Sequence, residues 1–198
     1  MLKVESPYRM SSGEHNDRWA ALSVFPGRRD GYFVELGAAD GFRCSACQML
    51  ERWRGWRGIC VEPNPAFYGD LKRNRPGSPC VRACVTGRTG TVRFLEDEWL
   101  SRVVGESESR ATQEVPSYSL ADLLNEYDAP ATVDYLVMDI EGCEKEVLSA
   151  YPFGQRQILA ISTEGAAARH IRGRTVSSVP ATASTRHGRG SRTSCTAR

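Results

Sequence analysis

Short runs of apolar residues recur along the chain and predict buried strands. The clearest runs lie at residues 32–36, 59–62, 135–139 and 158–161. The spacing of the apolar residues after the first run is typical of an amphipathic helix. These residues are Ala46, Met49, Leu50 and Trp53. Strands that alternate with helices predict a mostly parallel sheet with helices on both faces.

Local signals predict several other helices. Asn64 followed by proline at position 65 resembles an N-cap with proline at the first helical position. Ser119 and Asp122 have the form of a capping box before another helix, with Asp in place of the usual Glu or Gln. Helices are also predicted at residues 19–25 and 144–151.

The middle of the chain carries less regular signals. Residues 80–85 and 91–95 resemble strands on either side of a tight turn, and their alternation predicts a hairpin. Residues 96–116 are acidic and poor in apolar side chains. We therefore expect a loop there, which forms a flexible cover over a site.

The length of 198 residues suits one sizeable α/β domain. We expect a lead-in segment at 1–30, the domain at 31–164, and a basic, disordered tail at 165–198. The tail contains arginine but no acidic residue, and it has too few large apolar residues to complete a sheet. The expected fold class is therefore α/β, with a doubly wound, mostly parallel sheet that lacks its last C-terminal strands.

The composition, 40% hydrophobic and 25% charged, is that of a soluble globular protein. The 7 cysteines are odd in number and several lie in apolar runs, which predicts free thiols and a cytoplasmic location. The pairs Cys44 with Cys47 and Cys80 with Cys84 meet zinc-ligand spacing only loosely, so we expect no metal. The polar N-terminus and the acidic body indicate neither a membrane nor a nucleic-acid partner.

Two predicted strands end in residues suited to a nucleoside ligand. In a doubly wound sheet, ligands bind beyond the carboxyl ends of the strands. The first strand carries Glu35 near its end and continues into a loop at 37–41, where glycines let the backbone approach a ligand closely. The second strand ends in Glu62, and a carboxylate at that place can accept both ribose hydroxyls.

A group of carboxylates follows the strand at 135–139. Asp139, Glu141 and Glu144 lie within six residues of sequence. Carboxylates in close proximity raise one another's pKa, which suits a proton acceptor. Favourable charges at a helix N-terminus account for Glu144 equally well.

Three linked motifs resemble the FkbM family of methyltransferases. They are GYFVELGAADG at 31–41, GICVEPNP at 58–65 and DYLVMDIEGCE at 134–144. The segments 82–85 and 118–124 add weaker similarity, and the resemblance covers residues 17–164. The loop at 37–41 also fits the first motif of class I methyltransferases.

The resemblance implies a Rossmann-like class I fold and transfer of a methyl group from S-adenosylmethionine to a hydroxyl oxygen of a small molecule or sugar. The residues that it implies in cofactor binding are Glu35, Gly37, Ala39, Asp40, Gly41, Glu62, Asn64, Ala83, Cys84 and Asp139. Residues 35–41 would hold the methionine end, Glu62 the ribose, and Ala83 with Cys84 the adenine. Asp139 or Glu141, nearest the sulfonium and the substrate, would be the catalytic base.

Three alternatives remain from the sequence. The chain is a truncated, catalytically inactive remnant if the missing strands are essential. It is another nucleotide-binding enzyme on a doubly wound sheet, although it lacks a P-loop and a G-x-G-x-x-G motif. It is an RNA-binding module if the arginine-rich tail contacts phosphates.

Overall fold

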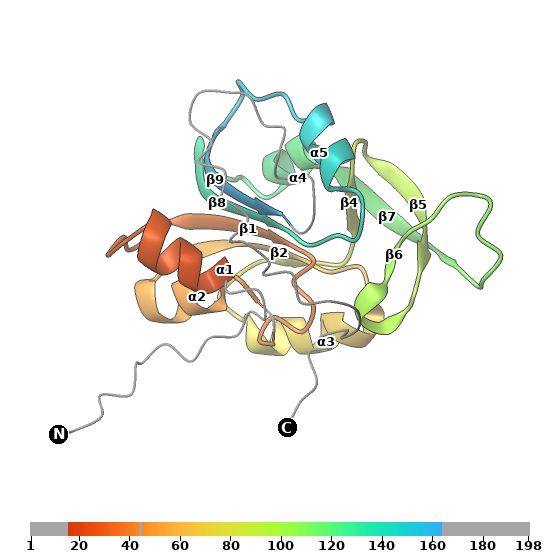
Figure 1. Ribbon diagram of the computed structural model, residues 1–198, viewed down its shortest axis with the longest axis horizontal. Helices are drawn as coiled ribbons and strands as arrows, with labels where there is room; N and C mark the ends of the chain where they lie inside the picture. The colour runs from red at the N-terminus through yellow and green to blue at the C-terminus, as the bar shows by residue number, and fades with distance from the viewer. Residues whose placement is uncertain (1–15, 44, 164–198) are drawn as a thin grey trace, which may run out of the picture.

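A parallel sheet forms the centre of the protein (Figure 1). The computed structural model describes residues 16–43 and 45–163. In these residues five strands pair in the order β3-β2-β1-β8-β9, and every neighbouring pair is parallel. The strands are β1 (Tyr32–Leu36), β2 (Arg57–Val61), β3 (Cys80–Val81), β8 (Thr132–Met138) and β9 (Gln157–Thr163). The predicted α/β class with a mostly parallel sheet is confirmed.

Helices cover both faces of this sheet (Figure 1). One face carries α1 (Asn16–Trp19), the π-helical turn η1 (Ala20–Val24), α2 (Gln48–Arg54) and α3 (Pro65–Asn74). The other face carries α4 (Leu120–Glu126) and α5 (Glu144–Ala150). Strand β1 serves both layers, because Val34 and Leu36 join the cluster with α4 and α5 whereas Phe33 joins the opposite one.

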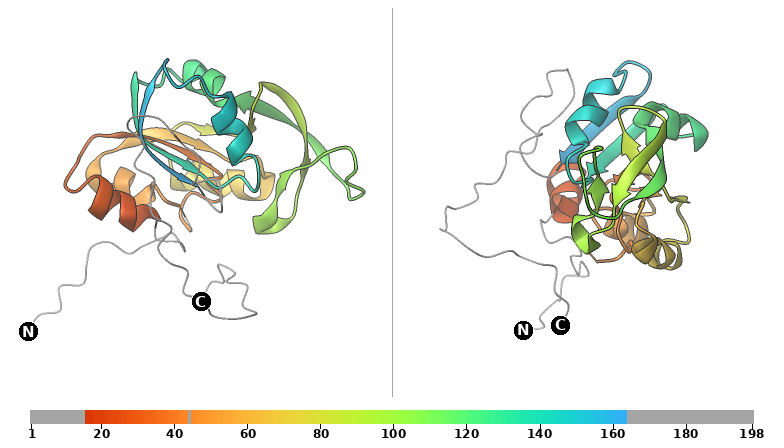
Figure 2. Two further views of the ribbon diagram at one scale, coloured as in Figure 1. Left: turned by 45° about the horizontal axis from the view of Figure 1, so that its top comes forward. Right: turned by 90° about the vertical axis from the view of Figure 1, so that its right-hand side faces the viewer.

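A second, mixed sheet lies to one side of the first (Figure 2). Its order is β4-β7-β5-β6. The strands are β4 (Cys84–Thr86), β5 (Gly90–Leu95), β6 (Arg102–Val103) and β7 (Gln113–Ser119), and the 3-10 turn η2 (Glu98–Leu100) precedes β6.

Two expectations for this region are wrong. The predicted hairpin of 80–85 with 91–95 does not form, because β7 lies between β4 and β5 and pairs with both. The stretch 80–85 itself divides between the two sheets. The predicted loop at 96–116 contains η2, β6 and the first part of β7. This segment escapes a sequence-based prediction because β7 is half-exposed, contains Pro116, and has few apolar residues to alternate.

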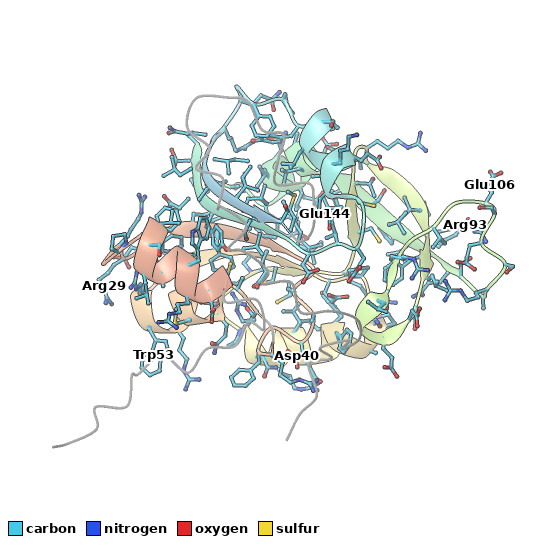
Figure 3. The ribbon with its side chains drawn as sticks, viewed as in Figure 1. Arg29, Asp40, Trp53, Arg93, Glu106 and Glu144 are labelled. Atoms are coloured by element: carbon cyan, nitrogen blue, oxygen red, sulfur yellow. The ribbon has the colours of Figure 1, made fainter. Side chains whose placement is uncertain are left out.

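The helix signals were more reliable than the strand signals in the middle of the chain. The Asn64 side chain caps α3 by accepting a hydrogen bond from the backbone N–H of Ala66 at 2.9 Å. The Ser119 hydroxyl caps α4 through the backbone N–H of Asp122 at 3.1 Å. Trp53 lies in α2 but does not belong to the apolar face predicted for this helix, because it is 48% exposed and points away from the body (Figure 3). The expected tail at 165–198 and the expected loss of C-terminal strands lie outside the described residues.

Candidate functional site

The order of the strands creates a topological switch point at the carboxyl ends of β1, β2 and β8. The chain passes from β1 to β2 on one side, and β8 pairs with β1 on the other side. The crevice at such a switch point, beyond the carboxyl ends of the strands, is where doubly wound sheets bind ligands. The segments 37–41, 62–64 and 139–142 follow β1, β2 and β8 and so meet at this edge.

Gly37 lies in backbone contact with the loop after β8. Its φ is +80°, and a Cβ built on it would lie 1.8 Å from the carbonyl oxygen of Asp139. The backbone N–H of Asp139 donates to the carbonyl oxygen of Leu36 at 3.0 Å. On the other side, the N–H groups of Gly37 and Ala38 both donate to the carbonyl oxygen of Val61 at 3.0 Å. The loop is therefore fixed to both neighbouring strands by its backbone.

Glu62 connects the first two strand ends. Its side chain is 6% exposed. The backbone N–H of Ala39 donates to Oε2 at 2.9 Å, and the backbone N–H of Asn64 donates to Oε1 at 2.8 Å. Burial raises the pKa of Glu62 from 4.5 to about 7, and the two N–H donors act in the opposite direction. Each oxygen keeps a lone pair, so the carboxylate can still accept hydroxyl donors from a ligand.

Asn64 links the end of β2 to the second sheet through a hydrogen bond to Ser101, which directly precedes β6. Its Nδ2 donates to the Ser101 hydroxyl at 3.0 Å, while its Oδ1 caps α3. The Ser101 hydroxyl in turn accepts from the backbone N–H of Asp97 at 2.9 Å and donates to the carbonyl oxygen of Glu98 at 2.7 Å. Ser101 escaped the sequence reasoning, because nothing in its local pattern shows that residues 97–101 return to the end of β2.

The Glu35 carboxylate points into the layer of α2 and α3. It accepts from the backbone N–H of Ala46 at 2.7 Å and from the Ser45 hydroxyl at 2.9 Å. It also forms an ion pair with Arg75 at 2.9 Å. The side chain is 2% exposed, so its contacts hold the two ends of the loop 37–43 together. A direct contact between Glu35 and a cofactor stays a prediction.

Asp40 and Gly41 form the turn at the end of the first loop. The Asp40 carboxylate accepts from the backbone N–H groups of Phe42 and Arg43 at 3.0 and 2.8 Å, and it pairs with the Arg43 guanidinium at 2.6 Å. Asp40 lies beside α3 (Figure 3), where Asn74 Nδ2 donates to its carbonyl oxygen at 2.8 Å.

The acids after β8 have different surroundings. Asp139 is exposed, and Glu141 is half-buried with a φ of +53°. Glu144 is buried at the beginning of α5 (Figure 3). Its carboxylate accepts from the backbone N–H groups of Ile140 and Gly142 at 3.1 and 3.0 Å. Glu144 thus orders the loop that presents the other two acids, which fits the interpretation of Glu144 as a helix-terminal residue.

Ala83 and Cys84 lie at the beginning of the second sheet and are 1% and 4% exposed. Burial, together with nearby Cys143 and Glu62, raises the pKa of the Cys84 thiol to about 12. The thiol therefore stays protonated at neutral pH and contributes apolar surface close to Glu62. A contact of Ala83 and Cys84 with an adenine stays a prediction.

Neither a metal-binding group nor a membrane-spanning helix occurs among the described residues. No group of three or more His, Cys, Asp or Glu side chains in the described part of the chain is placed to hold a metal ion. Among the described helices, none has both the length and the apolar character to span a membrane. The pair of Cys44 and Cys47, with its zinc-like spacing, lies partly outside this part of the chain, because Cys44 is not among the described residues.

The fold is that of a doubly wound α/β protein, whose loops after β1, β2 and β8 meet at a switch point of the parallel sheet. The methyltransferase FkbM domain family matches residues 35–168, which is more than half of the chain. The chain therefore belongs to the FkbM methyltransferase family, and the resemblance noted in the sequence is confirmed.

A solved structure gives a second comparison. The crystal structure of methyltransferase FkbM from Methylobacillus flagellatus KT is similar at 17% sequence identity and a TM-score of 0.45. The similarity covers 68% of this chain and 32% of that chain. This chain therefore spans about a third of the length of that protein. No curated protein matches the chain.

Proposed function

We propose that this chain binds S-adenosylmethionine at the edge formed by β1, β2 and β8 and transfers its methyl group to a hydroxyl oxygen of a small molecule or sugar. The observation that carries the proposal is the convergence of three segments at the switch point. These are the loop after β1, the buried carboxylate of Glu62 and the acids after β8. The proposed catalytic unit spans 31–164, with a lead-in segment before it and a basic tail after it.

The residues at this edge fit the cofactor chemically. The loop at 37–41 turns sharply at the carboxyl end of β1, because Gly37 has a φ of +80° and Ala39 a left-handed φ of +46°. Glu62 is already held by two backbone donors and has acceptor capacity for the two ribose hydroxyls. In this proposal Cys84, whose thiol feels the charge of Glu62, and the neighbouring Ala83 provide apolar surface for the adenine.

The chemistry of the proposed reaction assigns a separate role to the acids after β8. S-adenosylmethionine supplies an electrophilic methyl carbon on a sulfonium. An alcohol oxygen that bonds to that carbon would displace the sulfur, so that the carbon–sulfur bond breaks and S-adenosylhomocysteine leaves. The alcohol must also lose its proton, and a carboxylate oxygen of Asp139 or Glu141 accepts it in this proposal. Because Glu144 holds the backbone of Ile140 and Gly142, the main chain that carries the accepting carboxylate is ordered before the substrate binds.

Calorimetric titration with S-adenosylmethionine tests the cofactor site. We expect saturable binding, and we expect the Glu62→Ala change to weaken it by roughly ten- to a hundredfold, because hydrogen bonds to a charged group contribute about 1.5–3 kcal/mol. Glu114→Ala is the matched control, because Glu114 is exposed on β7 of the second sheet. Absence of binding by the folded wild-type chain would refute the proposal.

Methyl transfer from radiolabelled S-adenosylmethionine to a panel of hydroxyl compounds tests the second half. If Asp139 or Glu141 is the base, then Asp139→Asn or Glu141→Gln lowers kcat by about a hundredfold or more while the chain still binds the cofactor. Full activity in both variants would remove the base from the proposal. Binding without turnover by the wild-type chain on the whole panel would favour the inactive alternative.

A further inference from the structure

We propose that Arg75, at the C-terminal end of α3, is the positioning residue for the loop at 37–43. In this proposal its guanidinium ties together the two ends of the segment that carries residues 37–43, so that the loop is ordered before a ligand arrives. The inference rests on the proposed function, because the loop is the one assigned above to the methionine end of S-adenosylmethionine.

The guanidinium of Arg75 contacts both ends of the loop. Nη1 donates to Glu35 Oε2 at 2.9 Å and to the Ser45 hydroxyl at 3.0 Å. Glu35 precedes the loop on β1, and Ser45 follows it just before α2. Nε donates to Glu51, which lies on α2. The guanidinium carbon also lies 5.1 Å from the centre of the Phe33 ring, over its face.

The loop itself also contacts the end of α3. A Cβ built on Gly41 would lie 2.7 Å from Arg75 Cγ and 2.6 Å from Leu71 Cδ1. Gly41 therefore packs against the alkyl part of Arg75 in a space where no larger residue fits. One residue earlier in the helix, Asn74 donates to the carbonyl oxygen of Asp40. The end of α3 consequently holds the loop at its turn as well as at its two ends.

Burial makes this arrangement depend on the arginine. The Arg75 side chain is 1% exposed and that of Glu35 is 2% exposed. Burial acts to lower the pKa of Arg75, but the nearby carboxylates of Glu35 and Glu51 outweigh it and leave the pKa raised. Without the guanidinium, two carboxylates would face each other in an apolar layer, and the site could remain buried only by moving or by taking up protons.

Arg75→Lys and Arg75→Met are the test variants, and Arg54→Met is the matched control. Arg54 is likewise a buried arginine in the layer of α2, but its Nη1 donates to the carbonyl oxygen of Phe25, away from the loop. We expect the amides of residues 38–43 to exchange with deuterium at least tenfold faster in both Arg75 variants than in Arg54→Met. Lysine keeps the charge without the planar fork, so its exchange rate should lie between wild type and Arg75→Met.

Calorimetry with S-adenosylhomocysteine supplies the second readout. We expect the Kd to rise at least tenfold in Arg75→Met and by a smaller factor in Arg75→Lys, and to change less than twofold in Arg54→Met. In turnover, the Arg75 variants should raise KM for S-adenosylmethionine more than they lower kcat, because the loop holds the cofactor equally before and during reaction.

The outcomes separate this inference from the proposed function. If Arg75→Met does not fold, the Arg75→Lys result decides. Loop exchange and Kd in Arg75→Lys that equal those of Arg54→Met would overturn the positioning role. A wild-type chain that binds no S-adenosylhomocysteine would refute the proposed function, while faster loop exchange in the Arg75 variants would still support the structural link between Arg75 and the loop.

Discussion

Replacing Gly37 by alanine probes the backbone contact on which the site is built. The change adds one methyl group at a φ of +80°. That methyl carbon would lie 1.8 Å from the carbonyl oxygen of Asp139 and 2.8 Å from its carbonyl carbon, whereas real Cβ contacts essentially never fall below 3.0 Å. The ends of β1 and β8 must therefore move apart by more than an ångström, because the 1.8 Å separation has to increase to at least 3.0 Å.

The loss of stability in Gly37→Ala has a backbone part and a packing part, and the Gly27→Ala variant separates them. The left-handed φ destabilises alanine by about 1–2 kcal/mol. Alanine also lowers the conformational entropy of the unfolded chain, which offsets about 0.4–1 kcal/mol of that loss. Forcing the strand ends apart adds about 1–3 kcal/mol of overpacking. Gly27 has a φ of +75°, and a Cβ added there would meet nothing within 4 Å, so Gly27→Ala carries only the first part. We expect Gly37→Ala to lose about 2 kcal/mol more stability than Gly27→Ala.

Urea unfolding of the two variants, followed by circular dichroism, measures this difference. Calorimetry with S-adenosylhomocysteine then shows whether the displaced loop still binds. We expect Gly27→Ala to bind as the wild type does and Gly37→Ala to bind at least tenfold more weakly. Equal unfolding free energies and equal affinities in the two variants would refute the reasoning, because the close approach of Gly37 to Asp139 would then have no energetic consequence.

Three further changes test the surroundings of the site. Burial raises the pKa of Glu62 from 4.5 to about 7, so the Glu62 carboxyl group ionises at a lower pH in the unfolded chain than in the folded chain. The free energy of unfolding should therefore fall by roughly 3 kcal/mol as the pH rises from 4.5 to about 7. Glu62→Gln should remove this fall in urea titrations at pH 5 to 8, and an unchanged pH dependence would count against the buried carboxyl. Trp56→Ala should cost about 3–5 kcal/mol because Trp56 is 1% exposed, whereas Trp53→Ala, at a side chain 48% exposed, should cost far less, and similar losses would contradict the packing. Asn64→Ala should cost about 1 kcal/mol through the lost cap of α3, and more than Asn64→Ser, which keeps a capping oxygen and removes the Nδ2 donor to Ser101; equal losses would show that the cap contributes little.

The central sheet was predictable because its strands are buried on both faces. Such strands appear in a sequence as nearly continuous apolar runs, as at 32–36 and 135–139. The sequence predicted that glycines in the first loop let the backbone approach a ligand. In the structure, the missing Cβ of Gly37 makes room for the carbonyl oxygen of Asp139, a contact that the sequence did not reveal.

The second sheet was not predictable in the same way. Strands β5 and β7 are partly exposed, and adjacency in sequence suggested that β5 would pair with the strand just before it. Strand β7, which separates β4 from β5, begins at Gln113, whereas β4 already ends at Thr86. A pairing between segments so far apart leaves no local signal in the amino-acid pattern.

The candidate site shows the same division. The positions of Glu62, Asp139 and Glu141 at strand ends followed from the sequence, because parallel strands bring their carboxyl ends to one edge. The contact of Glu35 with Arg75 spans 40 residues and depends on how α3 packs against α2. Neither residue type nor spacing reveals such a contact before the packing is known.

Hydrogen–deuterium exchange with and without S-adenosylhomocysteine is the most direct test of the central claim. At saturating ligand, we expect slower exchange at the amides of 37–43, 62–64 and 139–142, which follow β1, β2 and β8. The turn at 87–90 in the second sheet should exchange at the same rate in both states. Protection at some other place, or no protection of these three segments in a folded chain, would contradict a cofactor site at the switch point.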